Sequence, residues 1–416
     1  HDDSKRQDCL RLWNNMAQRQ LYITGGIGSQ SSGEAFTSDY DLPNDTVYAE
    51  SCASIGLMMF ARRMLEMEGD SHYADVMERA LYNTVLGGMA LDGKHFFYVN
   101  PLEVHPKSLK FNHIYDHVKP IRQRWFGCAC CPPNIARVLT SIGHYLYTPR
   151  EDALYINIYA GNSMEVPVEN GTLRLRVSGN YPWQEQVTIA VESPQPVRHT
   201  LALRLPDWCT QPQIILNGEE VEQDIRKGYL HITREWQEGD TLNLTLPMPV
   251  RRVYGNPLVR HVAGKVAIQR GPLVYCLEQA DNGESLHNLW LPTDAPFTTF
   301  EGKGLFSHKI LIQTPGSRYE QSNPEQQPLW HYDGAPAAPT STGELKTPAH
   351  AGDKGKTLIT INHRAVGNLF RQLAVSCARH QYDVLSYRVF CRQADIGHPG
   401  ILRGITCQTA TTGLTL

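Results

Sequence analysis

The stretch GTLRLRVSGN, residues 171–180, decides the fold class of everything that follows residue 150 in this 416-residue chain. Leucine and valine alternate in it with threonine, arginine and serine, and Gly179 and Asn180 end the run. A period of two puts all the apolar side chains on one face of a strand, so that one face is buried and the other meets water. The stretch therefore predicts a β-strand of an antiparallel sheet.

Similar short runs continue on both sides of this strand. Examples are HTLALRLPDW (residues 199–208), GYLHITREW (228–236) and DTLNLTLPM (240–248), each bounded by Gly, Asn, Pro or Asp. Many short alternating strands at regular spacing are typical of two antiparallel sheets packed face to face. Residues 151–300 are therefore predicted to form an antiparallel β-sandwich.

The apolar spacing in residues 1–150 is helical instead. Apolar side chains recur every three or four residues in three segments, 4–20, 45–69 and 71–90. We expect Asp45 and Ser71 to cap the second and third of these helices, because short polar side chains suit the N-cap position. A further helix is expected after the proline pair at 132–133, since proline fits the first helical turn.

Residues 301–416 have neither period. Their first part is polar and rich in Pro, Gly and Ser, which indicates a linker-like segment, and the last fifty residues support no fold assignment. The sequence as a whole predicts a multidomain α + β protein with boundaries near residues 150 and 300.

The amino-acid composition limits the kinds of partner expected for this protein and the cellular compartment expected for it. The formal net charge is −3, so no basic surface for nucleic acid is expected. The longest apolar stretches are too short to span a membrane, and no signal peptide is visible. Seven of the ten cysteines are scattered singly, which favours a reducing compartment, and we expect the cytoplasm.

The motif FGCACCPPN, residues 126–134, brings three cysteines into four positions. The segment AESC adds Glu50 and Cys52, which can face one point where a helix begins irregularly. Thiolates and a carboxylate together form a suitable four-coordinate zinc site. Such a site would be rich in negative charge, and a coordinated thiolate would stay nucleophilic. The residues alone leave open a purely structural zinc site and, less simply, a strained disulfide between adjacent cysteines.

The loop TGGIGSQSSGEAF, residues 24–36, resembles a phosphate-binding loop only at first sight. It lacks the third glycine of the dinucleotide fingerprint and the lysine of a P-loop. We interpret it as a flexible loop that presents Glu34 to a cleft, where a carboxyl group between glycine and apolar neighbours can act as a general acid. The alternative is an ordinary solvated glutamate.

These motifs resemble glycoside hydrolase family 127, the β-L-arabinofuranosidases. The resemblance is carried by ITGGIGS, by GEAFTSDYDLPNDTVYAESCASIG and by FGCACCPPNIAR, and the runs LRLPDW, NGEEV and VAIQRGPLVYCLE resemble strands of the family's sandwich. It covers about residues 1–280. The combination of E-x-C with C-x-C-C-P-P makes it specific.

The resemblance implies a retaining glycosidase that uses a cysteine bound to zinc in place of the usual carboxylate nucleophile. Matched motif by motif, Cys130 is the nucleophile, Glu34 is the acid/base and Tyr98 lies beside the nucleophile at the substrate. Cys128 becomes a neighbour that does not bind metal. The implied zinc ligands are Glu50, Cys52, Cys130 and Cys131.

The resemblance also implies a fold and partners. The family's catalytic domain is an (α/α)6 barrel, which contains more helices than residues 1–150 predict. We therefore expect an incomplete (α/α)6 barrel followed by the antiparallel β-sandwich. The expected partner is a small glycoside or an oligosaccharide, with room for a homodimer. The alternatives are a non-enzymatic, zinc-stapled carbohydrate-binding fragment and a glycosidase of other sugar specificity on the same scaffold.

Overall fold

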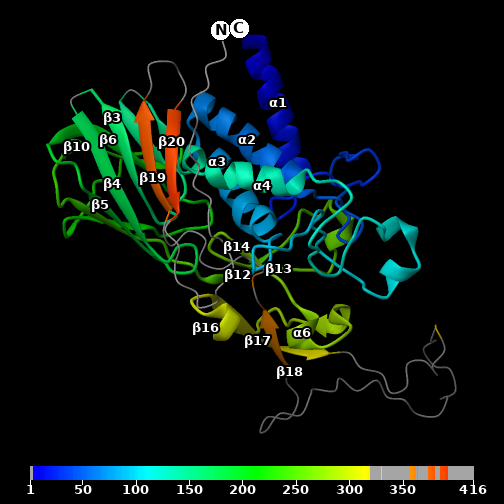
Figure 1. Ribbon diagram of the computed structural model, residues 1–416. Coiled ribbons are helices and arrows are strands. Elements are labelled where there is room, and N and C mark those ends of the chain that lie inside the picture. Colours follow the sequence, from blue (N-terminus) through cyan, green and yellow to red (C-terminus); the bar gives the residue numbers. More distant parts are fainter. Residues whose placement is uncertain are drawn as a thin grey trace.

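The computed structural model describes residues 3–150, 152–169, 171–318, 329, 357–361, 363, 373–379 and 385–391. Helices α1 to α4 lie beside two large sheets, and two smaller sheets lie below them (Figure 1). This arrangement of helices next to antiparallel sheets matches the mixed α + β class expected from the two sequence periods.

The helices concentrate in the first 150 residues. None of the helices in the described ranges is long and apolar enough to cross a bilayer. The α-helices are α1 (Asp3–Arg19), α2 (Ser51–Glu68), α3 (Ser71–Ala80), α4 (Cys131–Thr140), α5 (Gly143–Leu146) and α6 (Gln279–Asn282). The remaining helical turns are the π-helix η1 (Leu81–Val85) and the 3-10 turns η2 (Ser108–Lys110), η3 (His113–Tyr115), η4 (Arg260–Val262), η5 (Leu286–Asn288) and η6 (Gly304–Phe306).

Two expected helix caps are wrong by a few residues. Asp45 is not a cap, because it lies in a bend before a non-helical stretch in which Ala49 has a φ of 40°, and α2 begins only after Glu50, whose backbone is extended (φ −61°, ψ 140°). Ser71 is the first residue of α3, and the cap is Asp70, whose carboxylate accepts a hydrogen bond from the backbone N–H of His72. The early start expected for α2 is wrong because the residues just before the helix bond to other segments, as Glu50 does in its bridge with Val99.

Two large sheets follow residue 146. One has the strand order β1-β2-β6-β10-β9 and the other β20-β19-β3-β4-β5-β11-β7-β8. The strands of the first are β1 (Tyr147–Pro149), β2 (Ala153–Ile156), β6 (Val197–Arg204), β10 (Tyr229–Trp236) and β9 (Ile225–Arg226). Those of the second are β3 (Asn162–Val168), β4 (Gly171–Gly179), β5 (Gln186–Val191), β7 (Gln213–Leu216), β8 (Glu219–Glu220), β11 (Thr241–Thr245), β19 (Leu373–Arg379) and β20 (Leu385–Cys391).

The apolar–polar alternation predicted for residues 171–180 is confirmed on β4. Leu173, Leu175 and Val177 are buried there, while the arginines between them are half-buried or exposed. Most strand pairs are antiparallel, as predicted, with parallel pairing only of β2 with β6 and of β19 with β3 among the described strands. The alternation thus reports a strand with one buried face.

Two smaller sheets complete the described structure. They consist of β12 (Val250–Val253), β13 (Ala267–Arg270) and β14 (Leu273–Tyr275), and of β15 (Leu289–Trp290), β16 (Thr298–Glu301), β17 (Ile310–Arg318) and β18 (Thr357–Ile361). Residues after 300, for which the sequence supports no fold, therefore contribute strands to two sheets. Of the linker-like stretch expected from 316 to 356, the first three residues belong to β17 instead, and the rest lies outside the described residues except for Leu329.

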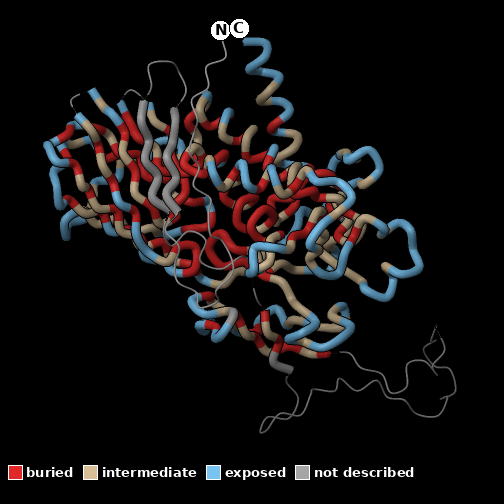
Figure 2. Tube along the Cα trace, in the orientation of Figure 1, coloured by how far each residue is buried: buried red, intermediate tan, exposed pale blue. Residues whose placement is uncertain are grey.

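One hydrophobic core connects the helices with the sheets. Buried side chains of α2 and α3, such as Met58 and Met77, belong to the same cluster as Leu201 of β6 and Val177 of β4 (Figure 2). Because this core is continuous, the positions of α2 and α3 are fixed against the first sheet.

A buried ion cluster strengthens the same junction. Arg204 on β6 is fully buried and pairs with Asp75 (Nη1–Oδ1 2.8 Å) and Glu78 (Nη2–Oε1 2.6 Å) of α3. Trp208 Nε1 donates to Glu78 Oε2 at 3.1 Å, and the Tyr181 hydroxyl donates to the same carboxylate. We call these five residues the Arg204 cluster. It joins α3 to the sheet through one guanidinium that faces two enclosed carboxylates, and burial raises the pKa of Asp75 to about 7.

Candidate metal and active site

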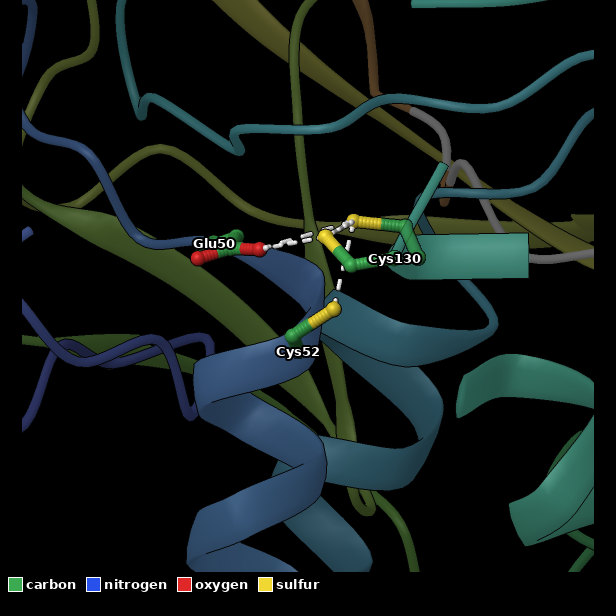
Figure 3. Close-up of side chains that lie close together, drawn as sticks. Glu50, Cys52 and Cys130 are labelled. Atoms are coloured by element: carbon green, nitrogen blue, oxygen red, sulfur yellow. Dashed lines mark hydrogen bonds between the residues drawn. The ribbon is translucent and has the colours of Figure 1, made fainter. Parts of the chain in front are cut away.

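Four acidic side chains meet where two helices begin. Glu50 is the N-cap of α2 and Cys52 lies in its first turn, while Cys130 is the N-cap of α4 and Cys131 is its first residue. Figure 3 shows Glu50, Cys52 and Cys130 pointing toward one another at these helix starts. We call Glu50, Cys52, Cys130 and Cys131 the sulfur cluster. The extended backbone of Glu50 explains how residues two apart face the same point.

The local sequence explains why α4 begins at the cysteines. Pro132 and Pro133 occupy the first turn of α4, where a missing backbone N–H leaves no intrahelical bond unmade. The backbone carbonyl of Cys130 accepts the first helical hydrogen bond, from Asn134 at 3.2 Å. The proline pair therefore places Cys130 and Cys131 at the N-terminal end of α4.

The spacing of the four ligand atoms fits zinc. They all lie within 4.8 Å of one another. The Cys52 and Cys131 sulfurs are 3.5 Å apart, those of Cys130 and Cys131 3.9 Å, and Cys130 Sγ lies 3.1 Å from Glu50 Oε1. Ligands about 2.3 Å from a tetrahedral zinc ion would be about 3.8 Å apart. Thiolates with one carboxylate are also a donor set that zinc favours.

The electrostatics of the cluster call for a cation. Burial raises the pKa of Cys130 to about 12, and a hydrogen bond with Cys52 together with burial raises the pKa of Cys131 strongly. The hydrogen bond from Cys131 lowers the pKa of Cys52 to about 7. Crowded acids therefore keep protons until a cation takes their place. The positive ends of two helix dipoles point at the same spot and favour negative charge there.

Tyr98 contacts the sulfur cluster from a third segment. Its hydroxyl lies 2.9 Å from Cys130 Sγ. The segment is held by a bridge between Glu50 and Val99 and by the bond from the Ser51 backbone N–H to the Tyr98 carbonyl, 2.9 Å long. The structure thus brings Tyr98 to the cysteine beside which the family resemblance predicts it.

Glu34 lies on an exposed turn and reaches the cluster through another tyrosine. Its backbone has a φ of 50°, which is uncommon for a residue with a side chain and which marks functional loops. The Tyr48 hydroxyl donates to Glu34 Oε1 at 2.9 Å, and the rings of Tyr48 and Tyr98 are 6.2 Å apart. A continuous series of side chains therefore runs from Glu34 through Tyr48 and Tyr98 to Cys130.

Cys128 stands apart from the four ligand atoms. It is exposed and does not belong to the group of possible metal ligands. The hydrogen bond from Tyr98 lowers its pKa, so it is a neighbour of the cluster on the solvent side. This position agrees with the motif register that leaves Cys128 out of the ligand set.

Three family models match the chain along most of its length. They describe the β-L-arabinofuranosidase GH127 catalytic domain over residues 1–144, the GH127 middle domain over 153–248 and the glycoside hydrolase family 127 C-terminal domain over 250–368. The chain belongs to glycoside hydrolase family 127. Membership extends past residue 280, where the resemblance read from the motifs ended.

Known relatives share both sequence and fold with this family member. The chain is 41% identical over 284 residues to the non-reducing end β-L-arabinofuranosidase of Bifidobacterium longum subsp. longum, a match that covers 67% of the chain and 43% of the relative. It superimposes on a GH127 β-L-arabinofuranosidase from Geobacillus stearothermophilus T6 with a TM-score of 0.78 and 46% identity, covering 88% of the chain and 55% of the relative. A second structure, a GH127 β-arabinofuranosidase, gives a TM-score of 0.72 at 32% identity, over 84% and 52%.

The chain therefore spans about half the length of the relatives that it matches. Antiparallel sheets and helical content are shared with them, and the (α/α)6 barrel stays a prediction.

Two side chains at the site, Tyr48 and Asn134, were not predicted from the sequence. Tyr48 carries no motif signal, whereas Asn134, three residues after Cys131, could have been found from helical spacing.

Proposed function

We propose that this chain is part of a retaining glycosidase that releases β-L-arabinofuranose from the non-reducing end of a glycoside. Family membership supports the glycosidase, and similarity to the non-reducing end β-L-arabinofuranosidase of Bifidobacterium longum supports the sugar. The sulfur cluster, with Tyr98 2.9 Å from Cys130, is the observation that carries the proposal. A merely structural metal site has no need of a phenol at one sulfur or of a nearby carboxylate on a strained loop.

Two displacements at the anomeric carbon make up the reaction. Cys130 sulfur attacks that carbon, a C–S bond forms, and the glycosidic C–O bond breaks while Glu34 gives its proton to the leaving oxygen. Glu34 then takes a proton from water, whose oxygen attacks the same carbon and breaks the C–S bond. Cys130 leaves as a thiolate, Glu34 is protonated again, and the configuration is retained.

The sulfur cluster would hold zinc through Glu50, Cys52, Cys130 and Cys131. When bound, the ion supplies positive charge that keeps the cysteines deprotonated at neutral pH, against the pKa values raised by burial and crowding. The protein's own part is to aim Cys130, whose direction is fixed by the start of α4.

Tyr48 and Tyr98 would hold the two reacting side chains at a set separation. Tyr48 donates to the Glu34 carboxylate from a half-buried position, which limits the motion of an otherwise exposed side chain. Tyr98 contacts the sulfur of Cys130 directly. Positioning of this kind contributes to the rate because reacting groups that are 1 Å out of place lose much of it.

The test is a covalent trap combined with metal analysis. Enzyme that turns over an aryl β-L-arabinofuranoside is treated with a reactive arabinofuranose analogue, digested and examined by mass spectrometry. The label is expected on the peptide that contains Cys130, with about one zinc ion per chain. A label on a glutamate would contradict the cysteine mechanism, and turnover of other sugars in preference would contradict the proposed substrate. Sugar binding without any turnover would favour the zinc-stapled binding fragment.

The compartment and the oligomeric state are also proposals. The cysteines whose side chains the structure describes are free thiols, which suits the cytoplasm that the sequence predicts. A homodimer is proposed only as compatible with the family scaffold.

A further inference from the structure

Besides Tyr98 at Cys130, a second side chain outside the ligands forms a hydrogen bond to the sulfur cluster. The Asn134 side-chain amide donates to Cys52 Sγ with Nδ2 and the sulfur 3.1 Å apart. Asn134 lies one helical turn after Cys130 and Cys131 on α4, so the helix that carries two ligands also carries a donor to a third. Cys52 belongs to α2, and the bond therefore links both helices at the cluster.

The orientation of this amide is fixed by a second residue. Arg137, a further turn along α4, donates from Nη1 to Asn134 Oδ1 at 2.8 Å. A guanidinium group has donors and no acceptor, so the atom that it contacts must be the amide oxygen. The amide nitrogen consequently faces the sulfur of Cys52, and the arrangement Arg137–Asn134–Cys52 has a single hydrogen-bond direction.

We propose that Asn134, oriented by Arg137, is a positioning residue that donates to the Cys52 thiolate and tunes how tightly the sulfur cluster holds its metal. The inference rests on the metal site of the proposed function and deepens it. Three thiolates and a carboxylate carry four negative charges against two on zinc. An N–H donor at one sulfur withdraws part of that excess charge without occupying a coordination position.

The donor also distinguishes two cysteines that otherwise bind alike. Cys52 receives the hydrogen bond of the Asn134 amide, a donor carried by the same helix as Cys130 and Cys131. Cys130 contacts Tyr98 on the side from which Glu34 is linked. Mutation of a side chain that hydrogen-bonds to a metal ligand typically lowers metal affinity by about 10- to 100-fold.

Asn134→Asp is the sharpest test, because it preserves the shape and the contact with Arg137. It places an oxygen where the amide nitrogen was, so that an acceptor faces the sulfur. Using the 416-residue chain itself, we would measure zinc affinity by competition with a chelator and record the sulfur-to-cobalt charge-transfer band after loading with Co²⁺. We expect about 10-fold or greater loss of affinity and a shift of the band to lower energy, since the sulfur electrons are no longer stabilised.

Two further variants and a control grade the effect. Asn134→Ala should move both readouts in the same direction by less, and Arg137→Gln by less again because the amide is then free to turn. Asn112→Ala serves as the control, since this residue caps an exposed turn through the backbone N–H of Ile114 and does not contact the cluster. It should alter neither affinity nor spectrum.

The outcomes separate this inference from the proposal beneath it. If the unaltered chain binds neither zinc nor cobalt, the metal site fails and this inference fails with it. If the chain binds metal and Asn134→Asp leaves both affinity and band unchanged, only the role of Asn134 is overturned. A folded Asn134→Asp variant with a weaker, red-shifted cobalt site supports the proposal, because a merely structural asparagine would not move the band.

Discussion

The Arg204 cluster, on α3, and the sulfur cluster, at the starts of α2 and α4, both gather acidic groups, and they differ in their source of positive charge. Arg204 lies between Asp75 and Glu78 and is itself fully buried, so the protein supplies the cation. The sulfur cluster gathers Glu50 with three cysteines, and the partners seen around it are the Tyr98 hydroxyl and the Asn134 amide. The first is enclosed, with one guanidinium between two carboxylates, and the second has no cationic side chain among these partners.

This difference teaches how to separate a structural cluster from a reactive one. An enclosed group of charges with its own counter-ion has nothing further to bind, and its residues fix one arrangement of α3 against the sheet. A group of acids at two helix starts, in which burial and crowding raise the pKa values of Cys130 and Cys131, is stabilised when a cation binds. Each prediction below changes one side of this comparison.

The largest effect is expected for Cys130→Ser. An alkoxide is far harder to form than a thiolate, so turnover should fall by about 10⁴-fold or more. Like Cys52→Ser and Cys131→Ser, this change removes a ligand, but turnover should be lost even in protein that retains zinc. The losses at Cys52 and Cys131 should instead follow the fall in metal content and stability. Activity on an aryl β-L-arabinofuranoside and metal analysis are the measurements. Substantial turnover by the serine variant would remove Cys130 from the reaction.

Arg204→Met should produce the largest loss of stability. It leaves Asp75 and Glu78 buried without a counter-ion, which is expected to lower the free energy of unfolding by about 3–5 kcal/mol. The matched control is Arg226→Met, because Arg226 pairs with Asp224 at the exposed surface, where no measurable loss is expected. Denaturant unfolding checks both variants. Equal losses would show that the Arg204 cluster is no more structural than a surface pair.

Metal binding should weaken as the pH falls. The pKa of Cys130 is raised to about 12 and that of Cys131 is raised strongly, so both hold protons in the metal-free cluster at pH 7. Zinc must displace these protons, and the apparent affinity should therefore drop by about 100-fold per pH unit on acidification. Below pH 7 the decline should steepen, because Cys52, with a pKa of about 7, becomes protonated as well. Chelator competition at pH 6, 7 and 8 measures the slope, and a flat profile would contradict a thiolate site.

Tyr48→Phe should have a moderate and selective effect. Without the hydroxyl that holds Glu34, turnover of substrates with poor leaving groups should fall by about 10-fold, and activated aryl glycosides should lose less. Tyr115→Phe is the control, since it removes a similar bond, from Tyr115 to Asp45 at 2.8 Å, away from Glu34. Glu34→Gln should show the same selectivity with a larger loss. If Glu34→Gln is selective and Tyr48→Phe is not, Glu34 keeps its role and the link through Tyr48 is wrong.

The smallest effect is expected for Cys128→Ser. Cys128 is exposed and lies outside the four ligand atoms, so zinc content should not change and turnover should fall by about threefold at most, through its contact with Tyr98. Metal analysis beside kinetics checks both statements. A loss of zinc would shift the motif register by placing Cys128 among the ligands.

The sequence predicted those features that depend on local spacing. The alternation of Leu173, Leu175 and Val177 identified β4, and Pro132–Pro133 identified the start of α4. The strands β18 to β20 were missed because the sequence there has no clear period. β20 pairs with the neighbouring β19, whereas β18 and β19 pair with strands earlier in the chain. For example, β19 pairs with β3 across some two hundred residues, and no local pattern announces such pairing.

The site was predictable as a set of ligands and not as a geometry. The family resemblance carried by E-x-C and C-x-C-C-P-P implied the four residues whose side chains lie within 4.8 Å of one another, but the cap predicted at Asp45 would have placed Glu50 inside a helix. The segment around Val99 draws Glu50 into an extended bridge instead. Tyr48 was invisible for the same reason, because its partner Glu34 meets it only after the loop has folded.

The convergence of two helix starts has a consequence for the chain between them. Cys52 and Cys131 are separated by 79 residues along the sequence. A metal ion bound by both would tie the ends of that segment together and remove loop-closure entropy of the unfolded chain worth about 4–5 kcal/mol, if it acts as a covalent cross-link does. The segment so closed contains Tyr98. The four side chains of the sulfur cluster would then also cross-link α2 to α4 and stabilise the fold. Selection for chemistry and selection for folding would therefore act on the same four side chains.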